Sequence, residues 1–230
     1  NVRAGMIAIA LDIVREQLQQ HLDWHWPNGR SHRALLMLAA LLHDAGKPSA
    51  RSVDAEGSIH FVQHDRIGEA LAVKRAAALR LSSDETARLA AIVRHHMRPH
   101  WLSGHAALTS RAIYRFWRAT GPAGVDICLL AIADYLATYG ARLDTQAWIH
   151  YVETVQMLLE RYFLSRDTAV APPALINGQQ LLDRFHLEPG RLIGELLEQV
   201  REAQVDGEIT TSEEALEWVQ RLLDGLKGKS

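Results

Sequence analysis

An all-α fold is predicted by two features of this 230-residue sequence. Apolar residues recur at helical spacing along nearly the whole chain, and the alternation of β-branched and polar residues that marks strands is almost absent. Because 48% of the residues are apolar, the chain can bury a sizeable core. We therefore predict one large helical domain or two modest ones.

The first half of the chain divides into helices with one long interruption. Helical periodicity predicts helices over 3–23, 32–46, 65–80 and 84–97. The last of these begins with a capping box, in which Ser82 and Glu85 satisfy each other's free amide groups. The interruption, 48–63, has a polar, glycine-containing centre flanked by Val, Ile and Phe, and it predicts a long loop with a short hairpin.

The second half continues the helical pattern. It predicts helices over 110–119, 122–139, 144–165, 178–185, 189–205 and 212–226. A second capping box, Thr211 with Glu214, begins the last helix. The stretch 165–179 contains two prolines and an Asn-Gly, so it is the best candidate for a linker between domains.

Charge, cysteine count and hydropathy exclude several classes of protein. The net charge is −2, so any contact with nucleic acid must come from a local basic face. We find no apolar run of about 18 residues and no signal-peptide pattern, and therefore predict a cytoplasmic protein that is not inserted in a membrane. The single cysteine, Cys128, lies in an apolar stretch and is interpreted as a core residue. The chain begins at Asn1 and is interpreted as a fragment of a longer protein.

The predicted helix over 32–46 ends in two residues that commonly bind metals, His43 and Asp44. This pair alone is weak evidence, because a histidine beside an apolar stripe is more often a hydrogen-bonded packing residue. Further candidates follow along the chain and strengthen the case. They are His64, His95, His96 and Asp134.

Helical geometry indicates which of these side chains face the core. His96 shares a helix face with Ile92 and Val93, whereas His95 is offset by about 100°. Asp134 lies one turn after Leu130, where an unpaired carboxylate would be costly to desolvate. We therefore predict a site for a divalent cation (Mn, Fe, Ni, Mg or Zn), with a metal-free polar network as the alternative.

Two groups of basic residues are candidates for binding phosphate. Lys47, Arg94 and Arg98 flank the histidines and could hold the phosphate of a substrate, although exposed arginines commonly do no more than solvate a helix. Arg111, Arg115 and Arg118 fall on one helix face, with Tyr114 and Trp117 alongside. That face could follow an RNA backbone, or it could be a solvated face above core aromatics, and the sequence favours neither.

The order His-Asp, His, His-His, Asp resembles the HD superfamily of metal-dependent phosphohydrolases. More closely, "LLHDAGKPSARSVDAEGSIHFVQHDRIGEALA", "IVRHHMRP" and "LAIADYLATYG" resemble the C-terminal part of bacterial tRNA nucleotidyltransferases, which comprise CCA-adding enzymes and poly(A) polymerase-like relatives. The resemblance covers about residues 35–223. It implies an HD domain over 1–165, a linker over 166–177 and a small helical, tRNA-contacting region over 178–230.

The sequence departs from these families in two ways. The nucleotidyltransferase head, with its Gly-Ser motif and paired aspartates, is absent from the chain. The HD pattern also places a first histidine where this chain has Gly5 or Met6. His21, His25 and His32 lie too far along the helices to replace it. The first coordination position is therefore expected to be vacant or filled by water.

The resemblance implies a phosphatase or phosphodiesterase that acts on a phosphoester or nucleotide, with tRNA as a further candidate partner. His43, Asp44 and Asp134 would hold the principal metal, while His64, His95 and His96 would complete a second metal site or bind phosphate. Asp44 and Lys47 are the expected catalytic residues. The alternative is a non-catalytic RNA-binding or spacer module with a degenerate metal site. The sequence leaves the oligomeric state open.

Overall fold

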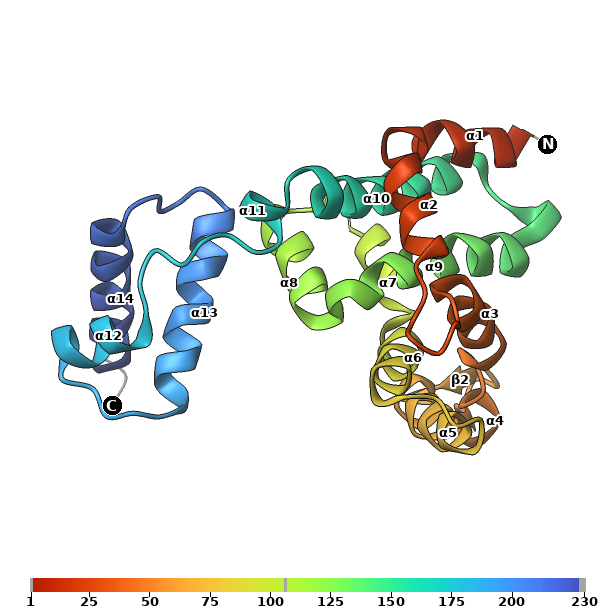
Figure 1. Cartoon of the computed structure of the whole chain (residues 1–230), viewed down its shortest axis with the longest axis horizontal. Coiled ribbons are helices and arrows are strands. Elements are labelled where there is room, and N and C mark those ends of the chain that lie inside the picture. Colours follow the sequence, from red (N-terminus) through yellow and green to blue (C-terminus); the bar gives the residue numbers. More distant parts are fainter. Residues whose placement is uncertain (1, 106, 228–230) are drawn as a thin grey trace. The chain divides into compact units, whose positions relative to one another are not determined.

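The prediction of an all-α fold is confirmed by a computed structural model, which describes residues 2–105 and 107–227. In this part of the chain the secondary structure is helical apart from one small hairpin (Figure 1). The residues fall into two compact units. The first comprises residues up to 108 together with 116–163, and the second comprises 109–115 with the residues from 164 onward. The domain limits at 165 and 178 therefore stay a prediction.

The N-terminal segment is less regular than expected. The single helix predicted over 3–23 is divided into α1 (Val2–Ala10), a 3-10 turn (Asp12–Val14) and α2 (Arg15–Asp23). Ile13 and Val14 are β-branched and are weak helix formers. The turn also leaves Val14 fully buried and Ile13 exposed. The interruption of the helix is therefore accompanied by burial of the Val14 side chain.

The next segment carries the His-Asp pair. Ser31 caps α3 (His32–Leu42) by accepting a hydrogen bond from the amide of Ala34. This helix ends before the predicted limit of 46, because residues 43–46 form a turn that leads into α4 (Lys47–Ala50). The predicted short hairpin is confirmed by the antiparallel strands β1 (Arg51–Val53) and β2 (Ile59–Phe61).

Two closely packed helices follow the hairpin. They are α5 (His64–Ala78) and α6 (Ser83–His95), and α6 begins with the predicted Ser82–Glu85 capping box. Small residues at every fourth position of α5 are buried, namely Gly68, Ala72 and Ala76. Because side chains this small let backbones approach closely, they account for the tight packing of the pair. A short helix that was not predicted, α7 (Arg98–Ser103), follows α6.

The first unit is completed by two long helices. α8 (Ser110–Thr120) leads through a 3-10 turn (Gly121–Ala123) into α9 (Gly124–Tyr139), and a second turn (Gly140–Arg142) precedes α10 (Thr145–Leu164). The buried side chains of α9 include Ile127, Leu130 and Cys128, so the interpretation of Cys128 as a core residue is confirmed. α9 therefore lies in the core of this unit.

One helical stretch meets a test of length and composition for a membrane span. Within the described part of the chain, Ser110–Tyr139 is long and apolar enough by that test, with a mean hydropathy of 1.3 over its best window. An unbroken apolar run, which the sequence does not contain, is a stricter criterion than average hydropathy. Because 56% of that window is buried inside the protein, it also has the character of a core helix.

The second unit has a core of its own. Besides residues 109–115 it contains α11 (Arg166–Ala169), α12 (Gly178–Phe185), α13 (Arg191–Val205) and α14 (Ser212–Lys227). The Thr211–Glu214 capping box begins α14 as predicted. The core residues are Ile176, Leu181, Leu196, Val200, Ala203, Ile209, Ala215 and Val219. Figure 1 shows α12, α13 and α14 side by side around this core.

Candidate metal and phosphoester site

Three histidines of the first unit are oriented by the same kind of hydrogen bond to the backbone. His43 follows α3, His64 begins α5 and His96 follows α6. Each Nδ1 lies 2.7–2.8 Å from the carbonyl oxygen three residues earlier, at Ala40, Phe61 and Val93 respectively. A carbonyl only accepts hydrogen bonds, so each Nδ1 must carry the proton. Whenever such a ring is neutral, its Nε2 therefore carries the lone pair on the opposite side.

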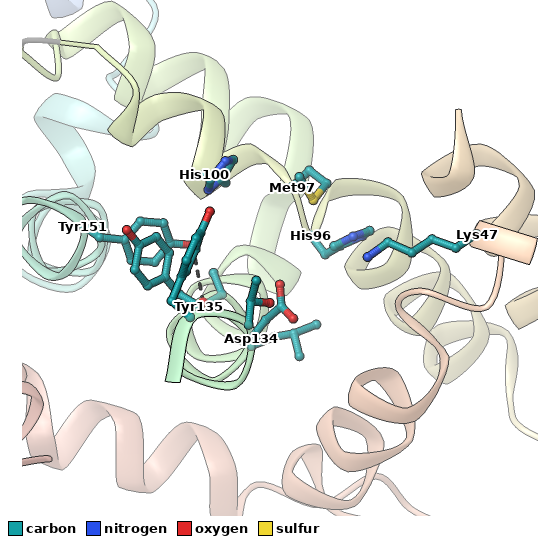
Figure 2. Close-up of a pocket in the computed structure, with 11 residues that line it drawn as sticks. Lys47, His96, Met97, His100, Asp134, Tyr135 and Tyr151 are labelled. Carbon is teal, nitrogen blue, oxygen red and sulfur yellow. Dashed lines mark hydrogen bonds between the residues drawn. The ribbon is translucent and has the colours of Figure 1, made fainter. Parts of the chain in front are cut away.

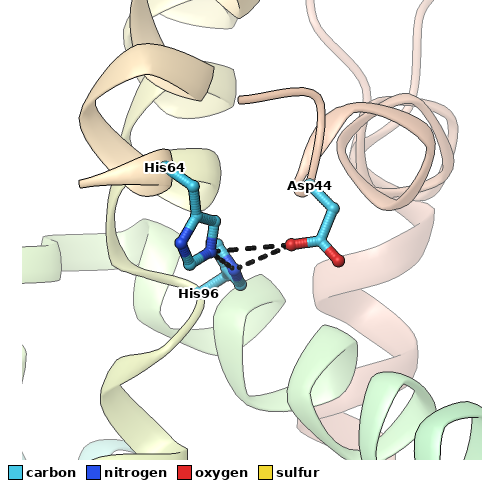
Figure 3. A group of neighbouring side chains, drawn as sticks. All are labelled: Asp44, His64 and His96. Carbon is cyan, nitrogen blue, oxygen red and sulfur yellow. Dashed lines mark hydrogen bonds and ion pairs between the residues drawn. The ribbon is translucent and has the colours of Figure 1, made fainter. Parts of the chain in front are cut away.

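These Nε2 atoms converge on Asp44. Its Oδ1 lies 3.6 Å from the Nε2 of His64 and 3.7 Å from that of His96. Its Oδ2 lies 3.3 Å from the Nε2 of His43. Figure 3 shows Asp44 facing His64 and His96 from the turn after α3. Helix ends contributed by α3, α5 and α6 thus bring one carboxylate and three imidazoles together.

The atoms at this point are well suited to a cation. The Nε2 atoms of His64 and His96 are 3.3 Å apart. Because the proton of each neutral ring is on Nδ1, each of these Nε2 atoms carries a lone pair, and the two lone pairs face each other. Among the described residues, the buried His43 Nε2 and Asp44 Oδ1 have no hydrogen-bond partner. The distances from Asp44 exceed 3.2 Å, which is longer than a good hydrogen bond. A divalent ion between these atoms would satisfy all of them.

Asp134 and Lys47 extend the cluster. The Oδ1 of Asp134, on α9, lies 3.4 Å from the Nε2 of His43. Lys47 Nζ pairs with Asp44 Oδ2 at 2.5 Å, and its ammonium also lies 5.7 Å from the centre of the Phe61 ring. The site therefore combines a lysine with two carboxylates.

Electrostatics favour charged ligands at this site. The nearby carboxylates of Asp134 and then Asp44, 3.4 and 3.3 Å from its Nε2, raise the pKa of His43 to about 10. Burial would raise the pKa of Asp44, but His43, His96 and Lys47 lower it well below its usual value. His43 also lowers the pKa of Asp134. Both carboxylates are thus ionised at neutral pH, and a metal ion would take the place of the proton on His43.

Comparison with known proteins agrees with this geometry. The HD domain family matches residues 4–139, which contain all five converging residues. The chain belongs to the HD domain family. A second family, described as tRNA nucleotidyltransferase domain 2, matches residues 141–219.

Curated relatives of this HD protein are tRNA nucleotidyltransferases. It is 33% identical to the A-adding tRNA nucleotidyltransferase of Deinococcus radiodurans, over 84% of this chain and 43% of the relative. It is 31% identical to the CC-adding tRNA nucleotidyltransferase of Thermus thermophilus, over 85% of this chain and 41% of the relative. A CC-adding enzyme of Synechocystis is 37% identical over a shorter stretch, 32% of this chain and 18% of the relative. The HD protein thus spans about two fifths of the length of the first two.

The remaining histidine of the predicted set lies apart from the others in the HD domain. His95 is next to His96 on the chain, and its Nδ1 accepts a hydrogen bond from the Nε of Arg98 at 3.1 Å. Burial, followed by the charges of Arg98 and Arg94, lowers the pKa of His95 to about 4. A neutral ring held by Arg98 does not join the convergence at Asp44.

The predicted phosphate-binding arginines of the HD domain have protein partners. Arg94 forms ion pairs with Asp65 and, at 3.5 Å, with Glu69 of α5. Arg98 is half-buried against His95, and burial lowers its pKa. Of the three predicted phosphate-binding residues, Lys47 is the one that touches the cluster around Asp44.

The predicted RNA-binding arginines are divided between the two units. Within the second unit, Arg115 makes a two-pronged contact with Glu202 at 2.6 Å for each prong. Arg111 pairs with Asp206 at 2.8 Å and with Glu208 at 3.4 Å. Arg118 belongs to the first unit and its side chain is exposed. The neighbouring aromatics, Tyr114 and Trp117, are buried.

The position of the missing first histidine of the HD pattern lies on α1. Gly5 is exposed, and a Cβ built there meets no atom within 4 Å. Two of the more distant histidines have other surroundings. His21 contacts the buried Asp126 at 3.0 Å, and His32 packs between Trp24 and Trp26.

A cavity of about 150 Å³ in the HD domain adjoins the cluster and was not foreseen from the sequence. Lys47, His96 and Asp134 line one part of it (Figure 2). The rest includes four aromatic side chains, His100, Tyr135, Tyr139 and Tyr151. The only sequence signal for them was the spacing of Tyr135 and Tyr139, one turn apart directly after Asp134.

Proposed function

We propose that this chain is a metal-dependent phosphohydrolase of the HD type that belongs to a tRNA nucleotidyltransferase-like protein. The observation that carries the proposal is the common anchoring of three histidines, each with Nδ1 on a carbonyl and Nε2 aimed at Asp44. Such anchoring by backbone carbonyls fixes the tautomer that binds metals. His43, Asp44, His64, His96 and Asp134 are the proposed ligands.

Each residue of the cluster has a role that follows from its surroundings. A divalent ion bound there would polarise a phosphoryl oxygen and lower the pKa of a water molecule. The two carboxylates supply negative charge that holds the ion, and the backbone carbonyls keep the histidine rings from rotating. Lys47 is a flexible cation whose side chain is 40% exposed, so it can turn from Asp44 to a phosphate oxygen. Lys47 is therefore the proposed phosphate-binding residue.

Metal binding and hydrolysis test this proposal together. Protein purified without chelator should contain a divalent transition ion, and Mn²⁺ added to the metal-free protein should raise its melting temperature. Mn²⁺ should also stimulate hydrolysis of bis(4-nitrophenyl) phosphate. Asp44→Asn should weaken Mn²⁺ binding by at least about 100-fold, the upper end of what the loss of an outer hydrogen-bonding partner causes, and should abolish the stimulation.

A matched control separates the site from the general effect of losing a carboxylate. Asp54 also pairs with a histidine, His60 at 2.6 Å, but on the exposed hairpin. Asp54→Asn should leave Mn²⁺ affinity unchanged. If the wild-type protein neither contains metal nor responds to Mn²⁺, the catalytic function is excluded, and the alternative of a non-catalytic module is the better account.

We further propose tRNA as a partner of this chain. Support comes from the second matched family and from the tRNA nucleotidyltransferases to which the chain is similar. Arg111 and Arg115 form ion pairs with acidic residues of the same unit. An RNA phosphate would therefore compete with these carboxylates for the two arginines. Replacing Arg111, Arg115 and Arg118 by Ala should reduce tRNA affinity and flatten its salt dependence. The Arg15→Ala variant is the control. If the triple variant shows the same dependence of tRNA affinity on salt concentration as this control, the arginine face is excluded as the RNA contact.

A further inference from the structure

The cavity beside the cluster has two chemically different parts. Lys47, His96 and Asp134 contribute charge and metal-binding atoms. Tyr135, on α9 one residue after Asp134, begins the aromatic part (Figure 2). A molecule that occupies this cavity therefore meets polar groups at one end and ring faces and edges at the other.

The aromatic part is a connected set of rings. The centre of the Tyr135 ring lies 4.1 Å from that of Tyr151 and 4.5 Å from that of Tyr139. His100 lies 6.4 Å from both Tyr135 and Tyr151. Tyr151 is buried, and its hydroxyl donates to the carbonyl of Ala131 at 3.3 Å. Tyr151 is thus a buried ring packed against Tyr135, whereas Tyr139 is 41% exposed.

The size of the cavity limits what the aromatic part can hold. Its volume of about 150 Å³ is similar to that of cavities of about 150 Å³ that admit a single benzene ring. Aromatic walls favour flat, polarisable rings over saturated ones, by about 0.5–1.5 kcal/mol for each ring pair. One planar ring matches this volume.

We propose that this cavity selects phosphoesters that carry a single planar ring. The ring contacts Tyr135 and Tyr139, while the phosphate lies toward Lys47 and Asp134. Tyr139 is the residue that determines specificity, because it is the exposed tyrosine of the aromatic set and lies directly beside the Tyr135 ring. That the ligand is a phosphoester rests on the proposed phosphohydrolase function. The preference for a planar ring rests on the lining of the cavity alone.

Two non-hydrolysable probes test the cavity independently of catalysis. Benzylphosphonate and cyclohexylmethylphosphonate differ in having a flat or a puckered ring on the same charged group. Isothermal titration of the Mn²⁺-loaded full chain should give about tenfold tighter binding of benzylphosphonate, which corresponds to about 1.4 kcal/mol. Hydrolysis of the matching pair, benzyl phosphate and cyclohexylmethyl phosphate, should show the same preference in KM with similar kcat.

Substitutions assign the preference to the cavity. Tyr139→Leu should remove the difference between the two phosphonates, and Tyr139→Phe should retain it. Trp101→Leu, which removes another exposed aromatic side chain outside the cavity lining, should leave it intact. Equal affinity of the wild-type protein for both probes, or an equal loss for both in Tyr139→Leu, would overturn the inference.

The outcomes also separate this inference from the proposed function. A ring preference in binding without hydrolysis of either ester would retain the cavity and exclude the hydrolase. Hydrolysis of both esters with the same KM would retain the hydrolase and exclude the ring site.

Discussion

His32 lies in an unusual environment for a titrating side chain. Its ring centre is 4.6 Å from those of both Trp24 and Trp26, and its buried Nδ1 has no hydrogen-bond partner among the described residues. Burial, followed by the positive charge of Arg88, lowers the pKa of His32 from 6.5 to about 4. The folded protein therefore keeps this ring neutral under conditions where the unfolded chain would protonate it.

This lowered pKa predicts a loss of stability in mild acid. Between pH 6.5 and 4 the unfolded chain binds a proton at His32 that the folded chain does not, so stability falls as the pH decreases through this range. His32→Phe keeps a flat ring but cannot titrate. The drop in urea midpoint from pH 7 to pH 5 should be smaller in His32→Phe than in the wild-type protein. His25→Phe, at an exposed position, should behave as the wild type does, and an equal drop in all three proteins would contradict the prediction.

Gly46 occupies a position that admits no side chain. A Cβ there would overlap the carbonyl oxygen of His64 and would lie 2.7 Å from the amide nitrogen of Gly68. The turn that carries Asp44 and the start of α5 that carries His64 are therefore in direct backbone contact.

We expect Gly46→Ala to separate these two segments. The added methyl group must push the turn and α5 apart, which lowers the melting temperature and weakens Mn²⁺ binding, because ligand positions are sensitive to shifts of about 1 Å. Calorimetric titration and thermal unfolding measure both effects. Gly5→Ala is the control, since no atom lies within 4 Å of its new Cβ, and it should be neutral or slightly stabilising.

At the level of helices, the contact between α5 and α6 depends on the size of the residues that α5 buries. Ala72 is fully buried in this contact, while Ala70 on the same helix is exposed. Ala72→Leu should lower the free energy of unfolding by about 1–3 kcal/mol through overpacking. Ala70→Leu adds the same side chain on the solvent side and should change stability little. Chemical denaturation of the two variants measures the difference, and similar losses in both would show that the spacing of the helices is not limiting.

Helix identity could be predicted from the sequence because it follows from local periodicity. The orientation of His96 toward the core and of His95 away from it came from a rotation of about 100° per residue, and His96 is indeed buried. The break at Ile13 was not predictable in this way, because it depends on burying Val14 against distant residues. The aromatic cavity was missed for the same reason, since Tyr151 joins Tyr135 only when α10 packs on α9.

The convergence at Asp44 was predictable in part. Residue type and order along the chain indicated which side chains could bind a metal. The backbone carbonyls that orient the rings, at Ala40, Phe61 and Val93, could not be inferred, because each of these hydrogen bonds depends on where a helix begins or ends. Boundaries of helices are the least predictable feature of a sequence.

At the scale of the whole molecule, the two units have separate cores. Leu196 is buried in the core of the second unit, remote in sequence from the proposed metal ligands. Leu196→Ala should cost about 2–5 kcal/mol in the stability of that unit. Hydrogen exchange should accelerate in α12, α13 and α14, whereas the Mn²⁺ affinity of the first unit should not change. A parallel loss of metal affinity would show that the units unfold together.

Membership of the two units does not follow the order of the chain. Residues 109–115 belong to the second unit although the first unit resumes at 116 and continues to 163. Tyr114 is buried, and burial, followed by the charge of Glu198 of α13, raises its pKa. A chain truncated after 163 would therefore lose the partners of Tyr114 and of Arg115, and an apolar ring would become exposed. The two halves of this protein are consequently not interchangeable parts, and a chimaera with a relative must exchange residues 109–115 together with everything from 164 onward.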